Sequence, residues 1–309
     1  GFERFVTQAV YAGKVGKCLL DLEKLSWQEP HSVAHQFAQE IQQRFPHVTV
    51  DTLHLKMRDL RIVKCDFEVK QIGKAIQLTK MGLDAVMQGL KPGVFEYQLA
   101  SLFSHTIRFN GADGNSFPTI AASGGDAVIL HYVENNKLVS EGDLLLLDLG
   151  VQYEEYCSDI SRTYPVNGKF SDEQKKYYNI VLKAMDAVIA MMKPGVPFAS
   201  LNIKCREVLA QALIEDGLIQ TADGLDQYYY HGVSHHLGLD VHDLGDRDGN
   251  LEPGMIFTVE PGLYIAEKNI GIRIEDDILI TETGAINLSV EIPKTVEAIE
   301  AYMSLTTSK

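Results

Sequence analysis

Apolar residues recur every three or four positions in several stretches of the chain, which is the pattern of an amphipathic helix. Two of these stretches are followed by Lys91-Pro92-Gly93 and Lys193-Pro194-Gly195, and both Pro and Gly end helices. The pattern predicts five helices, at residues 33–45, 66–90, 96–109, 172–192 and 201–216.

Shorter apolar runs between turn residues predict strands. We expect them at residues 17–22, 144–149, 152–157, 255–259, 263–266, 272–275 and 278–281. The runs at 144–149 and 152–157 flank Gly150, which is typical of an antiparallel hairpin. Helices combined with antiparallel strands place the chain in the α+β class.

Two parts of the chain repeat the same motifs in the same order. Lys91-Pro92-Gly93-Val94 recurs as Lys193-Pro194-Gly195-Val196. The other matches, at offsets of 112 or 111 residues, are Gly142 with Gly254, Asp148 with Glu260, Gly150 with Gly262, His131 with His242 and Ser123 with Ser234. We therefore expect two pseudo-symmetric half-domains of helices packed on antiparallel sheets, with the matched acids close to a pseudo-twofold axis.

The first 55 residues contain too few predicted elements for a comfortable core of their own. We interpret residues 1–55 as the remnant or tail of an N-terminal domain, and residues 56–309 as one larger domain. The chain opens with Gly1 rather than Met, which favours a fragment of a longer protein.

Composition excludes several classes of protein. With 45% apolar and 23% charged residues, the chain is an ordinary globular protein and not a disordered one. Its net charge of −14 argues against a nucleic acid or an anionic membrane as partner. The longest aliphatic run, residues 144–147, is too short to span a bilayer. The four cysteines are scattered, which suits reduced thiols and a cytoplasmic location.

Acidic residues follow the duplicated strands. Asp148 and Glu260 end two equivalent apolar runs, and Asp159 and Glu275 lie on the strands that follow. Four carboxylates confined to one pocket repel each other unless protons or cations neutralise them. Their charge matches two divalent cations, which bridging carboxylates hold about 3.5–4 Å apart. The pattern therefore predicts a dinuclear metal site.

Four of the ten histidines lie within twelve residues: His231, His235, His236 and His242. At least one of them should be a ligand, since imidazole together with carboxylates suits manganese, cobalt or zinc better than magnesium alone. Spacing does not choose among them. For His236, packing or exposure is as good an interpretation as a role in a site.

Five segments carry a resemblance to a known family. They are His131–Asn135, Asp148–Gly150 with Asp159, His231–Gly238, Val259–Gly262 and Gly271–Asp277. In this order they resemble the signature segments of the pita-bread (creatinase/aminopeptidase) metallopeptidases, most closely the bacterial Xaa-Pro aminopeptidases (aminopeptidase P). The resemblance covers roughly residues 56–305 and implies the pita-bread fold for this catalytic domain. Relatives carry a full N-terminal domain, so we expect most of that domain to be absent here.

The resemblance also implies the site. The metal ligands would be Asp148, Asp159, His235, Glu260 and Glu275, holding two divalent ions, with manganese preferred over cobalt or zinc. Glu260 would also be the general base, and His231, His242 and His131 would line the cleft and donate hydrogen bonds to the substrate. Arg273 shares a strand face with Glu275 and could orient a ligand carboxylate; an ordinary surface ion pair is the alternative. Cys157 is interpreted as a packing residue.

The activity that the resemblance implies is hydrolysis of the bond between an N-terminal residue and a following proline. Peptides with proline at the second position would be the substrates, and a homo-oligomer, dimer or tetramer, would be expected. Alternatives are a prolidase restricted to Xaa-Pro dipeptides, a methionine aminopeptidase, and a non-catalytic binding module of the same fold. The retained ligands disfavour that module and metal-free relatives that hydrolyse small amidino compounds.

Overall fold

The computed structural model describes residues 1–24 and 26–306 and divides the chain into two compact units, Gly1–Arg61 and Ile62–Lys309. Along this described part, no helix combines the length and apolar character needed to cross a membrane. The division after Arg61 lies six residues beyond the boundary expected from the sequence. Each unit is treated by itself below.

The smaller unit is built around one parallel strand pair. Strand β1 (Lys17–Leu20) pairs with β2 (Thr49–Thr52), and helix α2 (Val33–Arg44) supplies the crossover that a parallel pair requires. Helices α1 (Phe2–Tyr11) and α3 (His54–Arg61) complete the unit. Its buried apolar cluster is small and consists of Val10, Ile41, Phe45 and Val48. The sequence pattern missed α1, β2 and α3.

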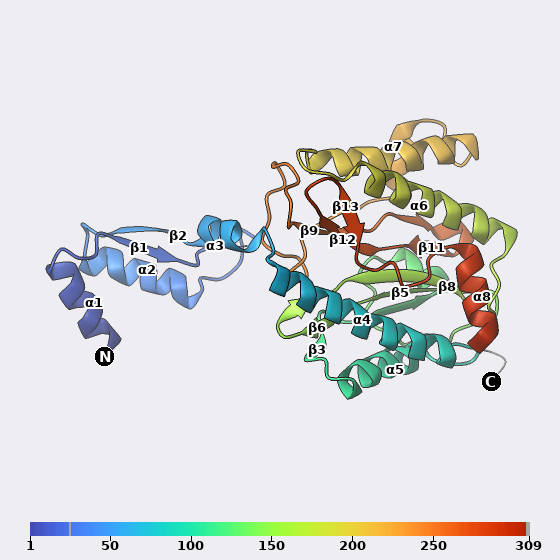
Figure 1. Ribbon diagram of the computed structural model, residues 1–309, viewed down its shortest axis with the longest axis horizontal. Coiled ribbons are helices and arrows are strands. Elements are labelled where there is room, and N and C mark those ends of the chain that lie inside the picture. Colours follow the sequence, from blue (N-terminus) through green and yellow to red (C-terminus); the bar gives the residue numbers. More distant parts are fainter. Residues whose placement is uncertain (25, 307–309) are drawn as a thin grey trace. The chain divides into compact units, whose positions relative to one another are not determined.

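Helices enclose the strands of the larger unit (Figure 1). Helices α4 (Asp66–Gly89) and α5 (Glu96–Phe109) pack on each other and against strands of the first half. Helices α6 (Asp172–Met191) and α7 (Ala199–Glu215) also pack on each other, and α6 packs against strands of the second half. These four agree with the predicted helices to within two residues at each end. Helix α8 (Val296–Thr306), which was not predicted, packs against α4 and α6.

The strands of the larger unit form short antiparallel sheets of two or three strands each. One sheet has the order β4-β5-β8 and another β13-β12-β9. The strands of the first half are β3 (Gly114–Asn115), β4 (Ile120–Ser123), β5 (Leu144–Leu149), β6 (Val151–Tyr153), β7 (Tyr156–Cys157) and β8 (Ile160–Pro165). Those of the second half are β9 (Ile256–Val259), β10 (Gly262–Ile265), β11 (Ile270–Arg273), β12 (Asp276–Ile280) and β13 (Ala285–Asn287).

The predicted hairpin around Gly150 is wrong. Residues 152–157 are not one strand: β6 and β7 pair with each other, and the turn between them is made by Glu154 and Glu155, both at positive φ. Strand β5 instead pairs with β4 and β8. The two-residue turn at positive φ is the geometry that twisted hairpins prefer, although it is usually made by Asn or Gly.

The predicted duplication is confirmed by the backbone. Gly93 and Gly195 have φ of 87° and 85°, and Gly142 and Gly254 have φ of 85° and 88°. The matching contacts are the bridges Phe95–Leu138 and Pro197–Asn250 and the 2.9 Å hydrogen bonds from Gly93 N to Val139 O and from Gly195 N to Leu251 O. Residues 138 and 139 thus correspond to 250 and 251, at the same 112-residue offset as the acids.

Strand register corrects one of the predicted matches. Ser123 lies opposite Leu145, whereas Phe257, the counterpart of Leu145, lies opposite His236. Ser123 is therefore equivalent to His236, and the predicted match of Ser123 with Ser234 is wrong. The strand registers also show that Asp159 is not the counterpart of Glu275 in the other half. Asp148 lies opposite Ser161. Its counterpart Glu260 follows Val259, which lies opposite Asp276, so continuing this register puts Glu275 opposite Glu260. Ser161 is therefore the counterpart of Glu275.

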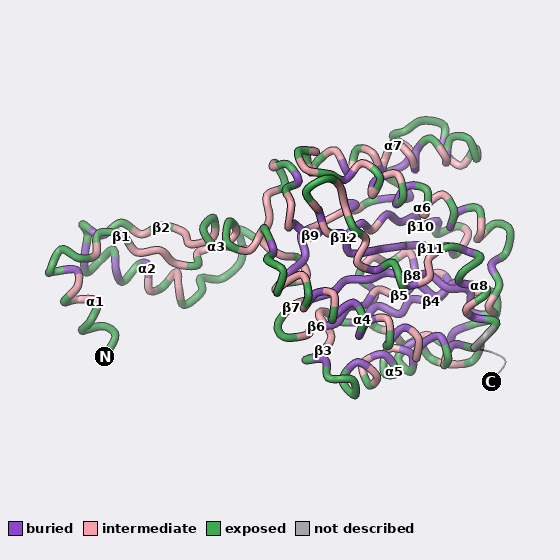
Figure 2. Tube along the Cα trace, viewed as in Figure 1, coloured by how far each residue is buried: buried purple, intermediate pink, exposed green. Residues whose placement is uncertain are grey.

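The core of the larger unit lies between the helices and the strands. Figure 2 shows that the strands are buried along most of their length, while the outer faces of the helices are exposed. Strand β8 is buried at all six positions and β5 at five of six. Strands buried on both faces are held rigidly by their packing, so the side chains at their ends are precisely enough placed to build a site.

Candidate metal centre

The four acids named by the sequence all lie at strand ends in the interior of the larger unit. Asp148 is the fifth residue of β5, and Glu260 directly follows β9. Asp159 lies between β7 and β8, and Glu275 lies between β11 and β12. Two of these acids thus come from each half of the duplicated unit.

Three of the five predicted ligands form a tight group. Ligand atoms of Asp159, His235 and Glu275 all lie within 4.8 Å of one another. Asp159 is 5% exposed and Glu275 is 2% exposed. His235 donates from Nδ1 to the carbonyl of His236 at 3.0 Å, so its Nε2 carries the lone pair when the ring is neutral. That Nε2 lies 3.4 Å from Oδ2 of Asp159.

The other two predicted ligands border this group. Oε1 of Glu260 lies 3.5 Å from Nε2 of His235 and accepts from the hydroxyl of Thr258 at 3.4 Å. Asp148 is held through Arg273, which donates to its Oδ2 at 2.7 Å. The other carboxylate oxygen of Asp148, Oδ1, and Oδ1 of Asp159 are covered from solvent and have no hydrogen-bond partner in the described part of the chain.

Burial and mutual repulsion disfavour the charged forms of three acids. The pKa of Asp159 is raised well above its usual value by burial and then by the charges of Asp148 and Glu260. Burial and then the charge of Asp159 do the same to the pKa of Glu275. Burial also raises the pKa of Glu260, against the opposing effect of His235 and Arg273. Such a cluster requires protons or cations for its stability.

These shifts predict the pH dependence of stability without cations. A carboxyl whose pKa is higher in the folded than in the unfolded protein stabilises the fold fully only below its unfolded pKa, and that contribution is lost as the pH rises through its folded pKa. From about pH 4 upward, the contributions of Asp159 and Glu275 should therefore decline in chelator-treated protein. Urea unfolding at pH 5 and pH 8 measures this decline.

The matched condition is the same protein with a divalent cation in excess. Cations replace the protons, so they should raise stability more at pH 8 than at pH 5. Equal stabilisation by cations at both pH values would contradict this explanation of the buried cluster.

Arg273 is a buried guanidinium at the centre of the site rather than part of a surface ion pair. It is 4% exposed. Besides Asp148, it donates from Nη1 to the hydroxyl of Tyr264 at 2.9 Å and from Nε to the hydroxyl of Ser161 at 2.9 Å. Each of the three guanidinium nitrogens thus donates a hydrogen bond to a side chain of the site.

Tyr264 is a site residue that the sequence analysis missed. Its hydroxyl accepts from Arg273 and lies 2.8 Å from Nε2 of His231. The sequence feature that could have indicated Tyr264 is Gly262, two residues before it. A Cβ on Gly262 would come within 2.6 Å of the Tyr264 hydroxyl, so only glycine leaves room for the ring beside the strand end that carries Glu260.

The remaining predicted histidines take different places. His231 donates from Nδ1 to Gly232 O at 2.8 Å, and burial, followed by the charge of Arg273, lowers its pKa to about 4. The ring of His242 stands edge-on to that of His235, with centroids 4.3 Å apart. His131 is exposed and lines the cavity. His236 is buried among Phe198 and Phe257, so packing is its role.

A cavity of about 580 Å³ opens onto the acids. Its polar wall includes all five predicted ligands together with His131, His231, His242 and Arg273. Its apolar wall includes Phe117, Ile120, Leu130, Phe198, Leu201 and Val241. Cys157 does not line it; burial raises the pKa of that thiol to about 12, in keeping with a packing residue. A cavity of this size with apolar walls and few convergent polar groups is typical of a small-ligand or peptide site.

The donor set fits divalent cations. It offers four carboxylates and one imidazole, and two of the covered carboxylate oxygens have no hydrogen-bond partner among the described residues. Oxygen donors with one imidazole suit manganese, cobalt or zinc. One guanidinium, Arg273, balances only part of the negative charge of four ionised acids, so cations complete the charge balance.

Comparisons with known proteins agree with this geometry. The profile of metallopeptidase family M24 matches residues 70–282. Xaa-Pro aminopeptidase from Escherichia coli strain K12 is 39% identical over 266 residues, which cover 80% of this chain and 60% of that protein. The chain thus spans about 60% of the length of this curated relative.

Two solved structures match nearly the whole chain. A provisionally named aminopeptidase P from Bacillus anthracis is 44% identical with a TM-score of 0.96, covering 99% of this chain and 73% of that one. A variant of E. coli aminopeptidase P in complex with substrate is 33% identical with a TM-score of 0.87, covering 98% and 74%. The expected pita-bread fold is confirmed, and the metallopeptidase family implies divalent metal ions. The chain belongs to metallopeptidase family M24.

Proposed function

We propose that this protein is a metal-dependent aminopeptidase that hydrolyses the bond between an N-terminal residue and a following proline. The observation that carries the proposal is the buried cluster of acids and His235, which opens into a cavity large enough for a short peptide. The relatives support the substrate class, because they are named Xaa-Pro aminopeptidase and aminopeptidase P.

Asp148, Asp159, His235, Glu260 and Glu275 would hold two divalent ions, with manganese as the preferred metal and cobalt or zinc as alternatives. Such ions, when bound, supply Lewis acidity and lower the pKa of a nearby water. Asp148 would bind them through Oδ1, because its Oδ2 accepts a hydrogen bond from Arg273. Arg273 thus orients a ligand carboxylate, as a supporting residue does in metal sites.

Glu260 is the general base in this proposal. Its carboxyl lies at the edge of the cluster, faces the cavity and has a raised pKa, which suits a group that takes a proton and gives it back. His231, His242 and His131 line the same cavity and would contact the substrate. Both ring nitrogens of His231 already make hydrogen bonds, Nδ1 with Gly232 O and Nε2 with the Tyr264 hydroxyl. One of these hydrogen bonds must break before His231 can hydrogen-bond a substrate.

A proline after the cleaved bond makes a tertiary amide without an N–H group. Peptidases that bind this N–H reject such substrates. A site that acts on the carbonyl and on the leaving nitrogen has no need of it, and the apolar wall around Phe198 and Leu201 can pack against a pyrrolidine ring.

The test is hydrolysis of an Xaa-Pro-Yaa tripeptide by purified protein after chelation and after addition of manganese. We expect turnover only with the metal, and bound metal measured by elemental analysis should approach two ions per chain. An Xaa-Pro dipeptide and a Met-initiated peptide without proline are the matched substrates. Cleavage of the dipeptide alone would indicate a prolidase, and cleavage of the Met peptide a methionine aminopeptidase. No turnover of any substrate by metal-loaded protein would favour a binding module.

A homo-oligomer, dimer or tetramer, and a cytoplasmic location belong to the same proposal. The net charge of −14 supports the absence of nucleic-acid and membrane partners. Light scattering during size-exclusion chromatography measures the oligomeric state.

A further inference from the structure

A single hydroxyl connects two charged side chains of the site. Ser161 is fully buried on β8, in the first half of the larger unit. Its Oγ accepts from Nε of Arg273 at 2.9 Å and lies 2.8 Å from Oε2 of Glu275, and both of these residues belong to the second half. Ser161 thus joins the two halves at the metal centre.

The direction of these hydrogen bonds follows from the chemistry of the groups. A guanidinium has only donors, so the Ser161 oxygen accepts from Arg273. The single hydroxyl hydrogen then points to Glu275, whose Oε2 is the acceptor. The bond orients the carboxyl and occupies one lone pair of Oε2, so Oε1 is the oxygen of Glu275 that is free of this contact and available to a cation.

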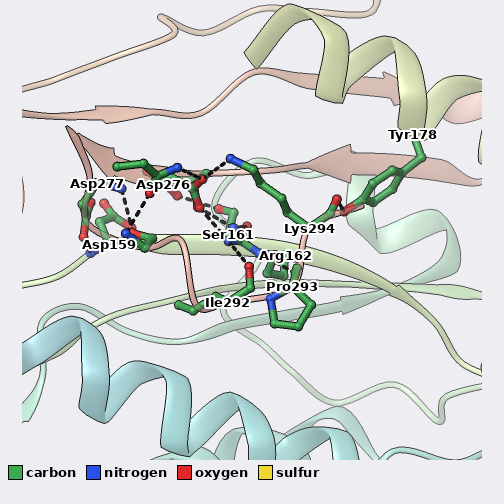
Figure 3. Close-up of polar contacts among 12 residues, drawn as sticks. Asp159, Ser161, Arg162, Tyr178, Asp276, Asp277, Ile292, Pro293 and Lys294 are labelled. Carbon is green, nitrogen blue, oxygen red and sulfur yellow. Dashed lines mark hydrogen bonds and ion pairs between the residues drawn. The ribbon is translucent and has the colours of Figure 1, made fainter. Parts of the chain in front are cut away.

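The duplication explains why a serine stands here. Ser161 and Glu275 occupy equivalent positions of the two halves, and so do the next residues, Arg162 and Asp276. Equivalent residues that touch each other lie beside the pseudo-twofold axis, where two glutamates would repel. The halves therefore carry complementary residues: Ser161 donates to Glu275, and Arg162 donates to Asp276 at 2.6 Å (Figure 3).

We propose that Ser161 is a positioning residue that orients Glu275 for cation binding. This inference rests on the proposed function only in assuming that the cluster binds divalent cations. Removing a residue that supports a metal ligand typically lowers metal affinity about 10- to 100-fold. Loss of the Ser161 hydroxyl leaves Glu275 without its side-chain donor, so the carboxyl can rotate and is less well prepared to bind.

The experiment is a calorimetric titration of the chelator-treated 309-residue chain with Mn²⁺ alone. Ser161→Ala should weaken binding about 10- to 100-fold, while Ser161→Thr keeps the hydroxyl and should bind like the wild type. Ser158→Ala is the matched control. Ser158 is equally buried and bonds Thr79 at 2.7 Å, so its loss should lower the unfolding temperature without changing Mn²⁺ affinity.

The outcomes separate this inference from the proposed function. Wild-type protein that binds Mn²⁺ together with a folded Ser161→Ala variant of unchanged affinity would overturn the role of Ser161 alone. Equal weakening by Ser161→Ala and Ser158→Ala would also overturn it, because a general loss of packing would then be the cause. Wild-type protein that binds no Mn²⁺ would overturn both proposals. If the alanine variant does not fold, Ser161→Cys keeps the volume with a weaker donor and should weaken binding in its place.

Discussion

Glu260→Gln is expected to lower kcat on an Xaa-Pro-Yaa peptide by about 100- to 10,000-fold, the usual contribution of a general base. The substitution keeps the size of the side chain and its position after β9 but removes a carboxylate that can take a proton. The protein should stay folded, because burial raises the pKa of Glu260 and its ionised form is not what stabilises the fold. Steady-state kinetics at saturating manganese, with circular dichroism of the same sample, provide the measurement.

Glu282→Gln is the matched control for this substitution. Glu282 is exposed beyond β12 and does not line the cavity, so its variant should retain wild-type turnover. A Glu260→Gln variant with near-wild-type kcat would reject Glu260 as the base. A variant that is slow at limiting manganese but reaches the wild-type rate at saturating manganese would instead show that Glu260 serves only as a ligand.

Arg162→Met is expected to lower the free energy of unfolding by about 3–5 kcal/mol, the usual cost of removing one partner of a buried ion pair. Arg162 is fully buried and donates to Asp276 at 2.6 Å, and its Nη1 and Nη2 also reach the carbonyls of Ser161, Glu275 and Ile292. Figure 3 shows Arg162 together with Ser161, Asp276 and Ile292. Methionine fills much of the volume but supplies no donor. Urea unfolding followed by far-UV circular dichroism measures the change.

Arg206→Met tests whether burial is the cause. Arg206 pairs with Asp226 at the surface, where the side chains are 34% and 73% exposed. Exposed ion pairs typically contribute about 0–1 kcal/mol, so this variant should unfold almost like the wild type. Similar losses in the two variants would contradict the explanation from desolvation.

The helices and most strands could be predicted because their signals are local. Helical spacing and the Pro-Gly stops set the bounds of α4 to α7 within two residues, and the repeated motifs predicted a duplication that the backbone confirms. The hairpin at Gly150 was wrong for a physical reason. Apolar runs indicate where strands lie but not which strands pair. Strand β5 pairs with β4 and β8 and not with the strand that follows it.

The sequence by itself determined the fold class, the two halves and the acids at their strand ends, because each of these follows from periodicity and from motifs repeated along the chain. Only the tertiary structure decided which side chains meet. It brought Tyr264 and Ser161 to Arg273 and made Ser161 rather than Asp159 the counterpart of Glu275. Strand register and packing between the halves set those contacts, and both depend on residues more than a hundred positions apart, such as Ser161 and Glu275.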